Sequence, residues 1–235
     1  MNITTFINKL KELDIILTDK QLDQLNIYAN FLIQYNTHTN LTAITNLEDI
    51  YLKHFYDSLT IVKQQEVDFK ENISIIDVGT GAGFPGMILK IVFPNIQLTL
   101  LDSNNKKITF LQELSNKLNI DDIIFVNERS EEYALKHLEY YDVVTSRAVA
   151  NLRVLTEICL PMVKENGYFI PLKGNINEEL PEAEKVIKVL NGRVNNIISF
   201  ELPIENSIRN IITIKKVGKT PNGYPRQYNK IKKGF

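Results

Sequence analysis

From Ile73 onward, short apolar runs alternate with amphipathic stretches, and this alternation limits the possible folds more than any other feature of the chain. Short apolar runs are typical of buried strands, and the stretches between them repeat apolar residues at helical spacing. Alternating strands and helices favour an α/β fold, a parallel sheet with helices on both faces. The predicted strands cover residues 73–78, 96–101, 123–127, 141–145 and 167–172, and the predicted helices cover 85–92, 104–118, 129–138, 150–163 and 178–190.

The N-terminal part of the chain departs from this pattern and is predicted to be helical. One amphipathic stripe, with apolar residues three and four apart, consists of Leu22, Leu25, Tyr28, Leu32 and Tyr35. A further helix is predicted over 48–63, and the polar segment 36–46 is predicted to be a loop. We therefore expect residues 1–65 to form a helical extension packed on the α/β core.

The C-terminal part also departs from the alternation. The last two apolar runs, 194–201 and 208–216, have no helix between them, so they are expected to pair as antiparallel strands. The α/β domain is thus predicted to cover 66–216, followed by a basic tail over 217–235, with the whole chain as one structural unit. From Lys215 to Phe235 there are seven basic residues and no acidic one.

A glycine-rich turn follows the first predicted strand, and it is the strongest ligand signal in the chain. The strand ends at Asp77, and the turn Gly79–Gly86 holds four of the ten glycines. Glycine adopts positive φ and leaves the main chain free to approach a ligand. The turn matches G-x-G-x-x-G, which also fits a dinucleotide-binding fold. A tight turn between strand and helix, with no ligand, would show the same residues.

Three features favour S-adenosylmethionine over a dinucleotide. Asp77 gives the turn the pattern D-x-G-x-G, with Gly79 and Gly81 as its glycines. The second strand ends in Asp102, where a carboxylate can accept hydrogen bonds from ribose hydroxyls. The antiparallel pair at the end of the chain is typical of class I S-adenosylmethionine-dependent methyltransferases with a Rossmann-like sheet. Asp102 would serve a nicotinamide cofactor equally well, or could cap the helix that follows.

Composition and charge exclude several classes of protein. The 235 residues carry a net charge of −1, which combines the basic tail with an acidic body. No apolar run reaches the length of a membrane span, the N-terminus lacks a signal-peptide pattern, and no metal-ligand spacing occurs. The single cysteine, Cys159, is consistent with a reducing compartment, and its side chain is predicted to pack in the core. We expect a cytoplasmic monomer without metal, whose basic tail either contacts a polyanion or is merely solvated.

At this level of detail the chain resembles the RsmG (GidB) family of bacterial small-subunit ribosomal RNA methyltransferases. The matching stretches are Asn40–Thr45, His54–Leu59, Asp77–Gly86, Asp102–Lys107, Ser146–Ala148 and Gly223–Arg226. The resemblance implies methyl transfer from S-adenosylmethionine to N7 of one guanine in 16S rRNA, as naked RNA or in the assembled subunit. It also implies cofactor contacts at Gly79, Phe84, Ser130, Glu131 and Arg147, with Ser130 standing where the family commonly has alanine.

The expected chemistry needs alignment and no general base, because guanine N7 carries a lone pair and no proton. Residues 145–147 lack the Asn-Pro-Pro-Tyr type motif with which adenine-N6 enzymes hold an amino group. Arg147 is the residue expected to position the reacting groups, although it could instead brace the sheet through a salt bridge. Four further residues are candidates for contact with RNA: Lys173, Lys219, Tyr224 and Arg226.

Two other functions stay open on the sequence. One is a methyltransferase of the same fold that acts on a small molecule or a protein, in which case the basic tail would be dispensable. The other is an NAD-dependent oxidoreductase, which would bind NAD and not S-adenosylmethionine. His54 and Asp57 lie on one helical face, and His54 is interpreted as an ordinary core or surface histidine.

Overall fold

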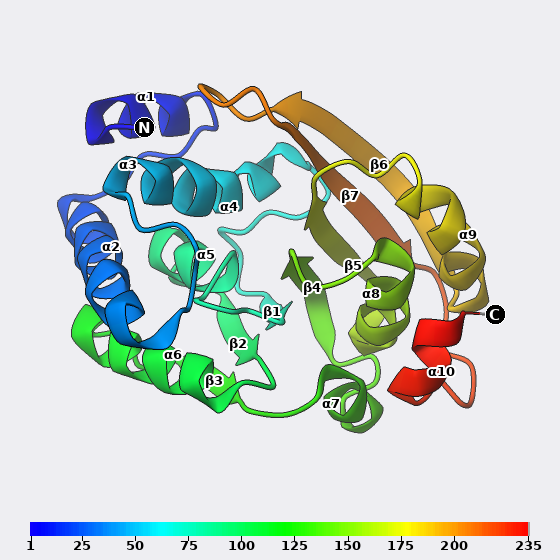
Figure 1. The fold of residues 1–235 in the computed structure, drawn as a ribbon. Helices are drawn as coiled ribbons and strands as arrows, with labels where there is room; N and C mark the ends of the chain where they lie inside the picture. Colours follow the sequence, from blue (N-terminus) through cyan, green and yellow to red (C-terminus); the bar gives the residue numbers. More distant parts are fainter. Residues whose placement is uncertain (235) are drawn as a thin grey trace.

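A seven-stranded sheet forms the centre of the protein, in a computed structural model that describes residues 1–234 (Figure 1). The strand order is β3-β2-β1-β4-β5-β7-β6. The first five strands pair in parallel, while β7 is antiparallel to both β5 and β6. The strands are β1 (Ser74–Val78), β2 (Gln97–Leu101), β3 (Ile123–Val126), β4 (Tyr141–Arg147), β5 (Val163–Lys173), β6 (Gly192–Glu201) and β7 (Ile208–Lys216). The predicted alternation and the terminal antiparallel pair are confirmed.

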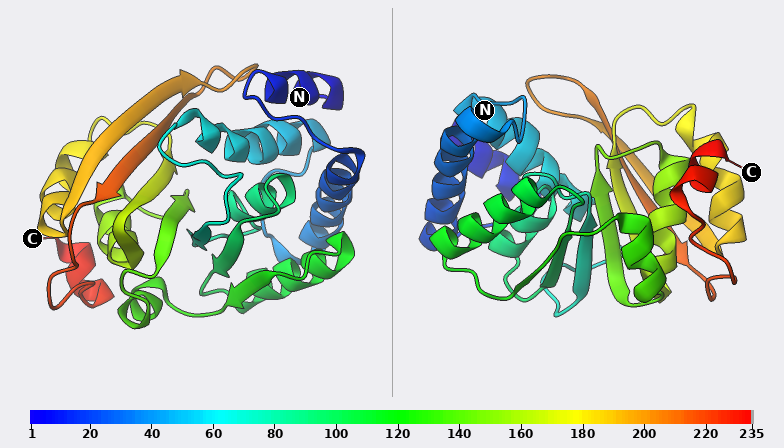
Figure 2. Two further views of the ribbon diagram at one scale, coloured as in Figure 1. Left: turned by 180° about the vertical axis from the view of Figure 1, so that it is seen from behind. Right: turned by 60° about the horizontal axis from the view of Figure 1, so that its bottom comes forward.

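Helices cover the two faces of the sheet as two separate groups, which the right-hand view of Figure 2 shows on opposite sides. One group consists of α1 (Ile3–Lys11), α2 (Asp19–Thr39), α3 (Leu47–Asp49), α4 (Asp57–Leu59), α5 (Gly86–Val92) and α6 (Asn105–Leu118). The other consists of α7 (Ser130–Lys136), α8 (Leu152–Cys159), α9 (Glu179–Val189) and α10 (Tyr228–Lys233). Neighbouring residues of β1 face opposite cores: Ile75 packs with the first group and Ile76 with the second.

The N-terminal helices differ from the prediction in two details. Helix α2 continues to Thr39, so the expected loop 36–46 begins later than predicted. The predicted helix 48–63 is helical throughout but changes type: α3 leads into a π-helix, η1 (Ile50–Tyr56), then α4 and a 3₁₀ turn, η2 (Thr60–Lys63). In η1 the Asp57 amide bonds to the carbonyl of Leu52, five residues back, which is the hydrogen bond that defines a π turn.

The C-terminal segment is folded onto the α/β domain. Ile231 of α10 is fully buried in the second core, and the Arg153 guanidinium of α8 donates to its carbonyl oxygen at 2.7 Å. Arg226 forms two hydrogen-bonded contacts with Glu157 of α8, at 2.6 and 2.7 Å, and Glu157 is fully buried. The predicted basic tail is therefore anchored to α8 through at least an ion pair, a backbone contact and an apolar side chain.

Candidate functional site

The glycine turn lies at the carboxyl end of β1, where parallel sheets bind ligands. Gly79 has φ of +69°, and a Cβ there would come within 2.4 Å of a methyl carbon of Val149. Only glycine therefore fits this position without a shift of the β4–α8 loop. Asp77 holds the turn from within, because one carboxylate oxygen accepts from the Thr80 hydroxyl at 2.8 Å and from the Gly86 amide at 2.9 Å.

Asp77 itself is buried and only half satisfied. Burial raises the pKa of its carboxyl to about 6, against the hydrogen bonds from Gly86 and Thr80 that lower it. Its second oxygen, Oδ1, is buried without a hydrogen-bond partner among the described residues. A buried unpaired acceptor beside an open glycine turn fits a site that is completed by a donor on a ligand.

Asp102 of the β2 end faces the same turn. It accepts from the amide of Gly81 at 3.0 Å and from that of Asn104 at 2.9 Å, with the Lys107 ammonium at 3.4 Å. Helix α6 is capped by Asn104 and not by Asp102. A carboxylate offers about four acceptor positions, so Asp102 retains capacity for ribose hydroxyls.

One cavity, of about 290 Å³, gathers most of the residues that the sequence assigned to the cofactor. Its wall includes Gly79, Asp102, Ser130 and Glu131, from the ends of three neighbouring strands. Phe84 is placed elsewhere: it is buried and stacks on His54 with ring centroids 4.2 Å apart. The expected contact of Phe84 with the cofactor stays a prediction.

A second cavity, of about 330 Å³, adjoins the first, because Ala148 lines both. Arg147 and Lys173, which the sequence singled out, lie in its wall. Four basic and two acidic side chains line it in total: Lys53, Arg147, Lys173, Arg209, Asp57 and Glu205. Its charge balance is positive, which suits an anionic substrate such as RNA.

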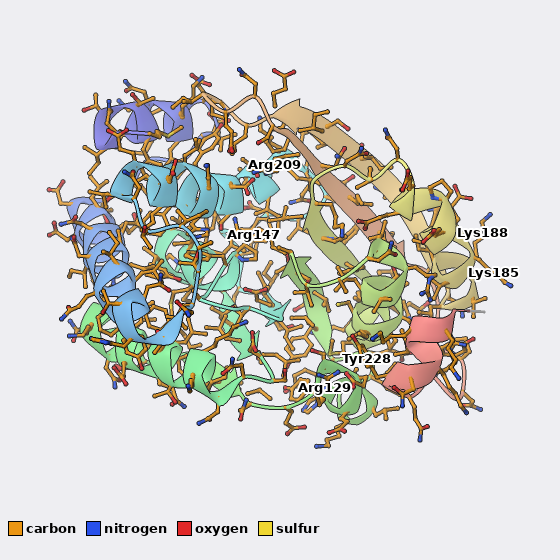
Figure 3. All side chains as sticks on the ribbon, viewed as in Figure 1. Arg129, Arg147, Lys185, Lys188, Arg209 and Tyr228 are labelled. Carbon is orange, nitrogen blue, oxygen red and sulfur yellow. The ribbon has the colours of Figure 1, made fainter. Side chains whose placement is uncertain are left out.

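Arg147 is held by a network of buried polar groups. Its guanidinium donates to the Lys53 carbonyl at 3.0 Å and lies 3.3 Å from an Asp57 carboxylate oxygen. Arg209 of β7 approaches the same carboxylate at 3.1 Å, and Figure 3 shows the two arginines near one another. The sequence analysis gave a salt bridge as an alternative to a positioning role for Arg147. The structure shows both that salt bridge, with Asp57, and the placement of Arg147 in the cavity wall.

His54 completes this network in its neutral form. A guanidinium can only donate, so Nδ1 of His54 accepts from Arg147 at 3.2 Å, and Nε2–H faces the Thr42 hydroxyl at 3.0 Å. Burial and the adjacent Arg147 charge lower the pKa of His54 to about 3. The sequence spacing indicated that His54 and Asp57 share a helical face. It did not indicate that Arg209, which is distant in the chain, belongs to the same network.

The four candidate RNA contacts have differing surroundings. Lys219 is exposed, and Tyr224 is half-buried with its ring centroid 5.9 Å from the guanidinium carbon of Arg226. Arg226 is paired with Glu157, and Lys173 is paired with Glu179 at 2.7 Å. Contact of these four residues with RNA stays a prediction.

The sheet order and the two adjoining cavities at the carboxyl ends of its strands define a protein with the class I methyltransferase fold. Solved structures with this fold include a SAM dependent methyltransferase from Aquifex aeolicus, at 18% identity and a TM-score of 0.57, covering 76% of this chain and 98% of that one. A ribosomal protein L11 methylase from Lactobacillus delbrueckii subsp. bulgaricus gives 15% identity and a TM-score of 0.52, covering 74% and 81%.

The family is shown by sequence. The model of the family described as rRNA small subunit methyltransferase G matches residues 21–211, and the chain belongs to that family. Similar proteins, each called ribosomal RNA small subunit methyltransferase G, occur in Bacillus subtilis and Oceanobacillus iheyensis, both at 47% identity. The alignments cover 97% of this chain and 95% of the Bacillus protein, and 94% of each chain for the Oceanobacillus protein.

Proposed function

We propose that this protein transfers a methyl group from S-adenosylmethionine to N7 of a guanine in 16S rRNA of the small ribosomal subunit. The proposal rests mainly on the two cavities that adjoin at Ala148. One has the glycine turn and the strand-terminal carboxylate that suit the cofactor, and the other is lined by arginine and lysine. Family membership and the names of the relatives support ribosomal RNA as the substrate.

The residues present fit the cofactor. Gly79, Asp102, Ser130 and Glu131 would hold it, and the unpaired Oδ1 of Asp77 offers a further acceptor beside the turn. When bound, S-adenosylmethionine supplies an electrophilic methyl group on a sulfonium. The role of the protein is then to bind, orient and exclude water, which accounts for catalysis by positioning.

The second cavity suits an acceptor that needs no deprotonation. Of its described lining residues, His54 has both ring nitrogens engaged and a pKa lowered to about 3, and Asp57 is shared by two arginines. Glu205 lies 3.3 Å from the Lys53 ammonium. Guanine N7 has a lone pair and no proton, so it can attack without a base. This match supports N7 over an exocyclic amine.

The partner and setting follow from the same proposal. Among residues 1–234 no group of three or more His, Cys, Asp or Glu side chains could hold a metal, and no helix is long and apolar enough to cross a bilayer. The basic C-terminal segment on an acidic body supports recognition of a folded target, either 16S rRNA or the assembled small subunit. We propose action as a monomer in the cytoplasm.

Mass mapping of 7-methylguanosine in 16S rRNA, from cells with and without the gene, tests the activity. An unchanged count of 7-methylguanosine would exclude the proposed rRNA methylation. The alternative function, methylation of a small molecule or a protein, would then replace it. Titration with S-adenosylmethionine and NAD tests the cofactor, since a nicotinamide enzyme would bind only NAD.

Arg147→Ala tests the positioning role. Loss of this guanidinium from the wall of the second cavity should lower single-turnover methyl transfer about 100-fold, the order of cost for a misplaced reactant. Cofactor affinity, measured by calorimetry, should change far less. Full transfer by Arg147→Ala would remove Arg147 from the site.

A further inference from the structure

Tyr228 lies in the wall of the cofactor cavity, although it belongs to the C-terminal segment. It is the first residue of α10, and it lines the 290 Å³ cavity together with Gly79, Asp102 and Glu131. Of the tyrosines in this segment, the sequence analysis singled out only Tyr224, as a candidate for contact with RNA. In the structure, Tyr228 lines the cavity that suits S-adenosylmethionine.

Arg129 holds the Tyr228 ring in place. The guanidinium carbon of Arg129 lies 4.8 Å from the ring centroid, within the range of a cation–π contact. The same guanidinium is paired with the Glu131 carboxylate at 3.2 Å. Figure 3 shows Arg129 and Tyr228 close together between α7 and α10. The β3–α7 loop and the C-terminal segment are thus joined at the edge of the cavity.

Helix α10 is anchored well enough to serve as a fixed wall. Its Ile231 is fully buried, and Arg153 donates to the Ile231 carbonyl at 2.7 Å. Just before the helix, Arg226 is paired with the buried Glu157. The position of Tyr228 is therefore set by the folded α8–α10 contact and does not require RNA.

The sheet order indicates which end of the cofactor reaches Tyr228. The acceptor cavity lies on the side of β4, where Ala148 joins the two cavities. Asp102 at the end of β2 suits the ribose hydroxyls. Beyond β2 lies β3, and the loop after β3 carries Arg129, Ser130 and Glu131. The base, which follows the ribose away from the methyl group, is then expected at this loop, beside Tyr228.

We propose that Tyr228 is a further cofactor-binding residue that packs its ring against the adenine of S-adenosylmethionine, with Arg129 fixing that ring. This inference rests on the proposed function, because it presupposes the cofactor. An aromatic ring and a guanidinium plane are surfaces on which a nucleobase stacks. The C-terminal segment then closes the cofactor site, so docking of α10 and binding of the cofactor strengthen each other.

Calorimetric titration with S-adenosylhomocysteine tests the proposal, since this product retains the adenosine half. Tyr228→Ala should weaken binding roughly 5- to 100-fold, the range for a lost base–aromatic stack. Tyr228→Phe keeps the ring and should stay within about threefold of the original affinity. Lys230→Ala, an exposed position on the same helix, is the matched control and should bind unchanged. Should Tyr228→Ala fail to fold, Tyr228→Leu replaces it, with the same expected loss.

Trypsin cleavage at the lysines of α10 gives a second readout that does not depend on activity. S-adenosylhomocysteine should slow this cleavage in the unaltered protein and in Tyr228→Phe, but far less in Tyr228→Ala. Folded Tyr228→Ala that binds as tightly as the unaltered protein would overturn the proposal, as would Tyr228→Phe that binds as weakly as Tyr228→Ala. If the unaltered protein does not bind S-adenosylhomocysteine at all, the proposed function fails first.

Discussion

Replacing Asp57 with asparagine removes a carboxylate that two guanidinium groups share. Asp57 lies 3.3 Å from Arg147 and 3.1 Å from Arg209, and its side chain is 10% exposed. Removing one partner of a buried ion pair costs about 3–5 kcal/mol. Here Arg147 keeps its bond to the Lys53 carbonyl, and Arg209 is partly hydrated. We therefore expect a loss of ~2–3 kcal/mol in the free energy of unfolding.

Thermal unfolding measures this loss directly. For a chain of this length, 1 kcal/mol shifts Tm by about 2–4 °C, so Asp57→Asn should melt roughly 4–12 °C lower. The matched control is Asp49→Asn, whose ion pair with Lys53 at 3.6 Å is partly exposed and should contribute about 0–1 kcal/mol.

The same variant should also be slower, because Arg147 loses a group that orients it. Single-turnover methyl transfer should fall about 10- to 100-fold, while the affinity for S-adenosylhomocysteine is retained. If Asp57→Asn and Asp49→Asn differ by less than about 0.5 kcal/mol and transfer equally fast, the reasoning is refuted, and the Lys53 and His54 contacts alone hold Arg147.

Two further predictions concern buried charges away from the acceptor cavity. The pKa of Asp77 is raised to about 6, so the folded state binds more protons than the unfolded state between pH 4 and pH 6. The free energy of unfolding should therefore fall by ~3 kcal/mol as pH rises through this window. Urea midpoints measured across this pH range should show the fall in the unaltered protein but not in Asp77→Asn. If the midpoints of the two proteins change with pH in parallel, the prediction is wrong. Arg226→Ala leaves the buried Glu157 carboxylate without its ion-pair partner, and should lower Tm by roughly 6–20 °C, unlike Lys230→Ala, and speed tryptic cleavage of α10.

Most of the α/β architecture could be predicted from the sequence, because hydrophobic periodicity reports directly on burial. The apolar runs around Ile75 and Ile212 are buried in the core as expected, and the glycine turn lines a cavity that a ligand can enter. A local signal also indicated Asp102, because it follows immediately after a predicted strand, whereas Ser130 and Glu131 were indicated only by the family resemblance.

The parts that could not be predicted depend on contacts between distant segments. Arg209 meets Asp57 across more than 150 residues of sequence, and no local pattern indicates that pairing. Tyr228 and Arg226 belong to a segment whose charge suggested a solvated or RNA-binding tail. In the structure, the buried Glu157 of α8 pairs with Arg226, and Arg129 of the β3–α7 loop contacts the ring of Tyr228. Charge patterning reports on composition, and it cannot reveal which charges are neutralised within the fold.

The π-helix η1 makes the geometry of the acceptor cavity depend on a residue count. A π turn accommodates one residue more than the α-helical turn it replaces, and each residue of an α-helix turns the chain by about 100°. Within this wider turn, Lys53, His54 and Asp57 all reach Arg147. Deleting a single residue from 50–56 would rotate the residues before the deletion relative to those after it. Lys53, His54 and Asp57 could then no longer all contact Arg147, even if all three side chains were retained. Segment length at this point is therefore as informative as residue identity when relatives of this chain are compared.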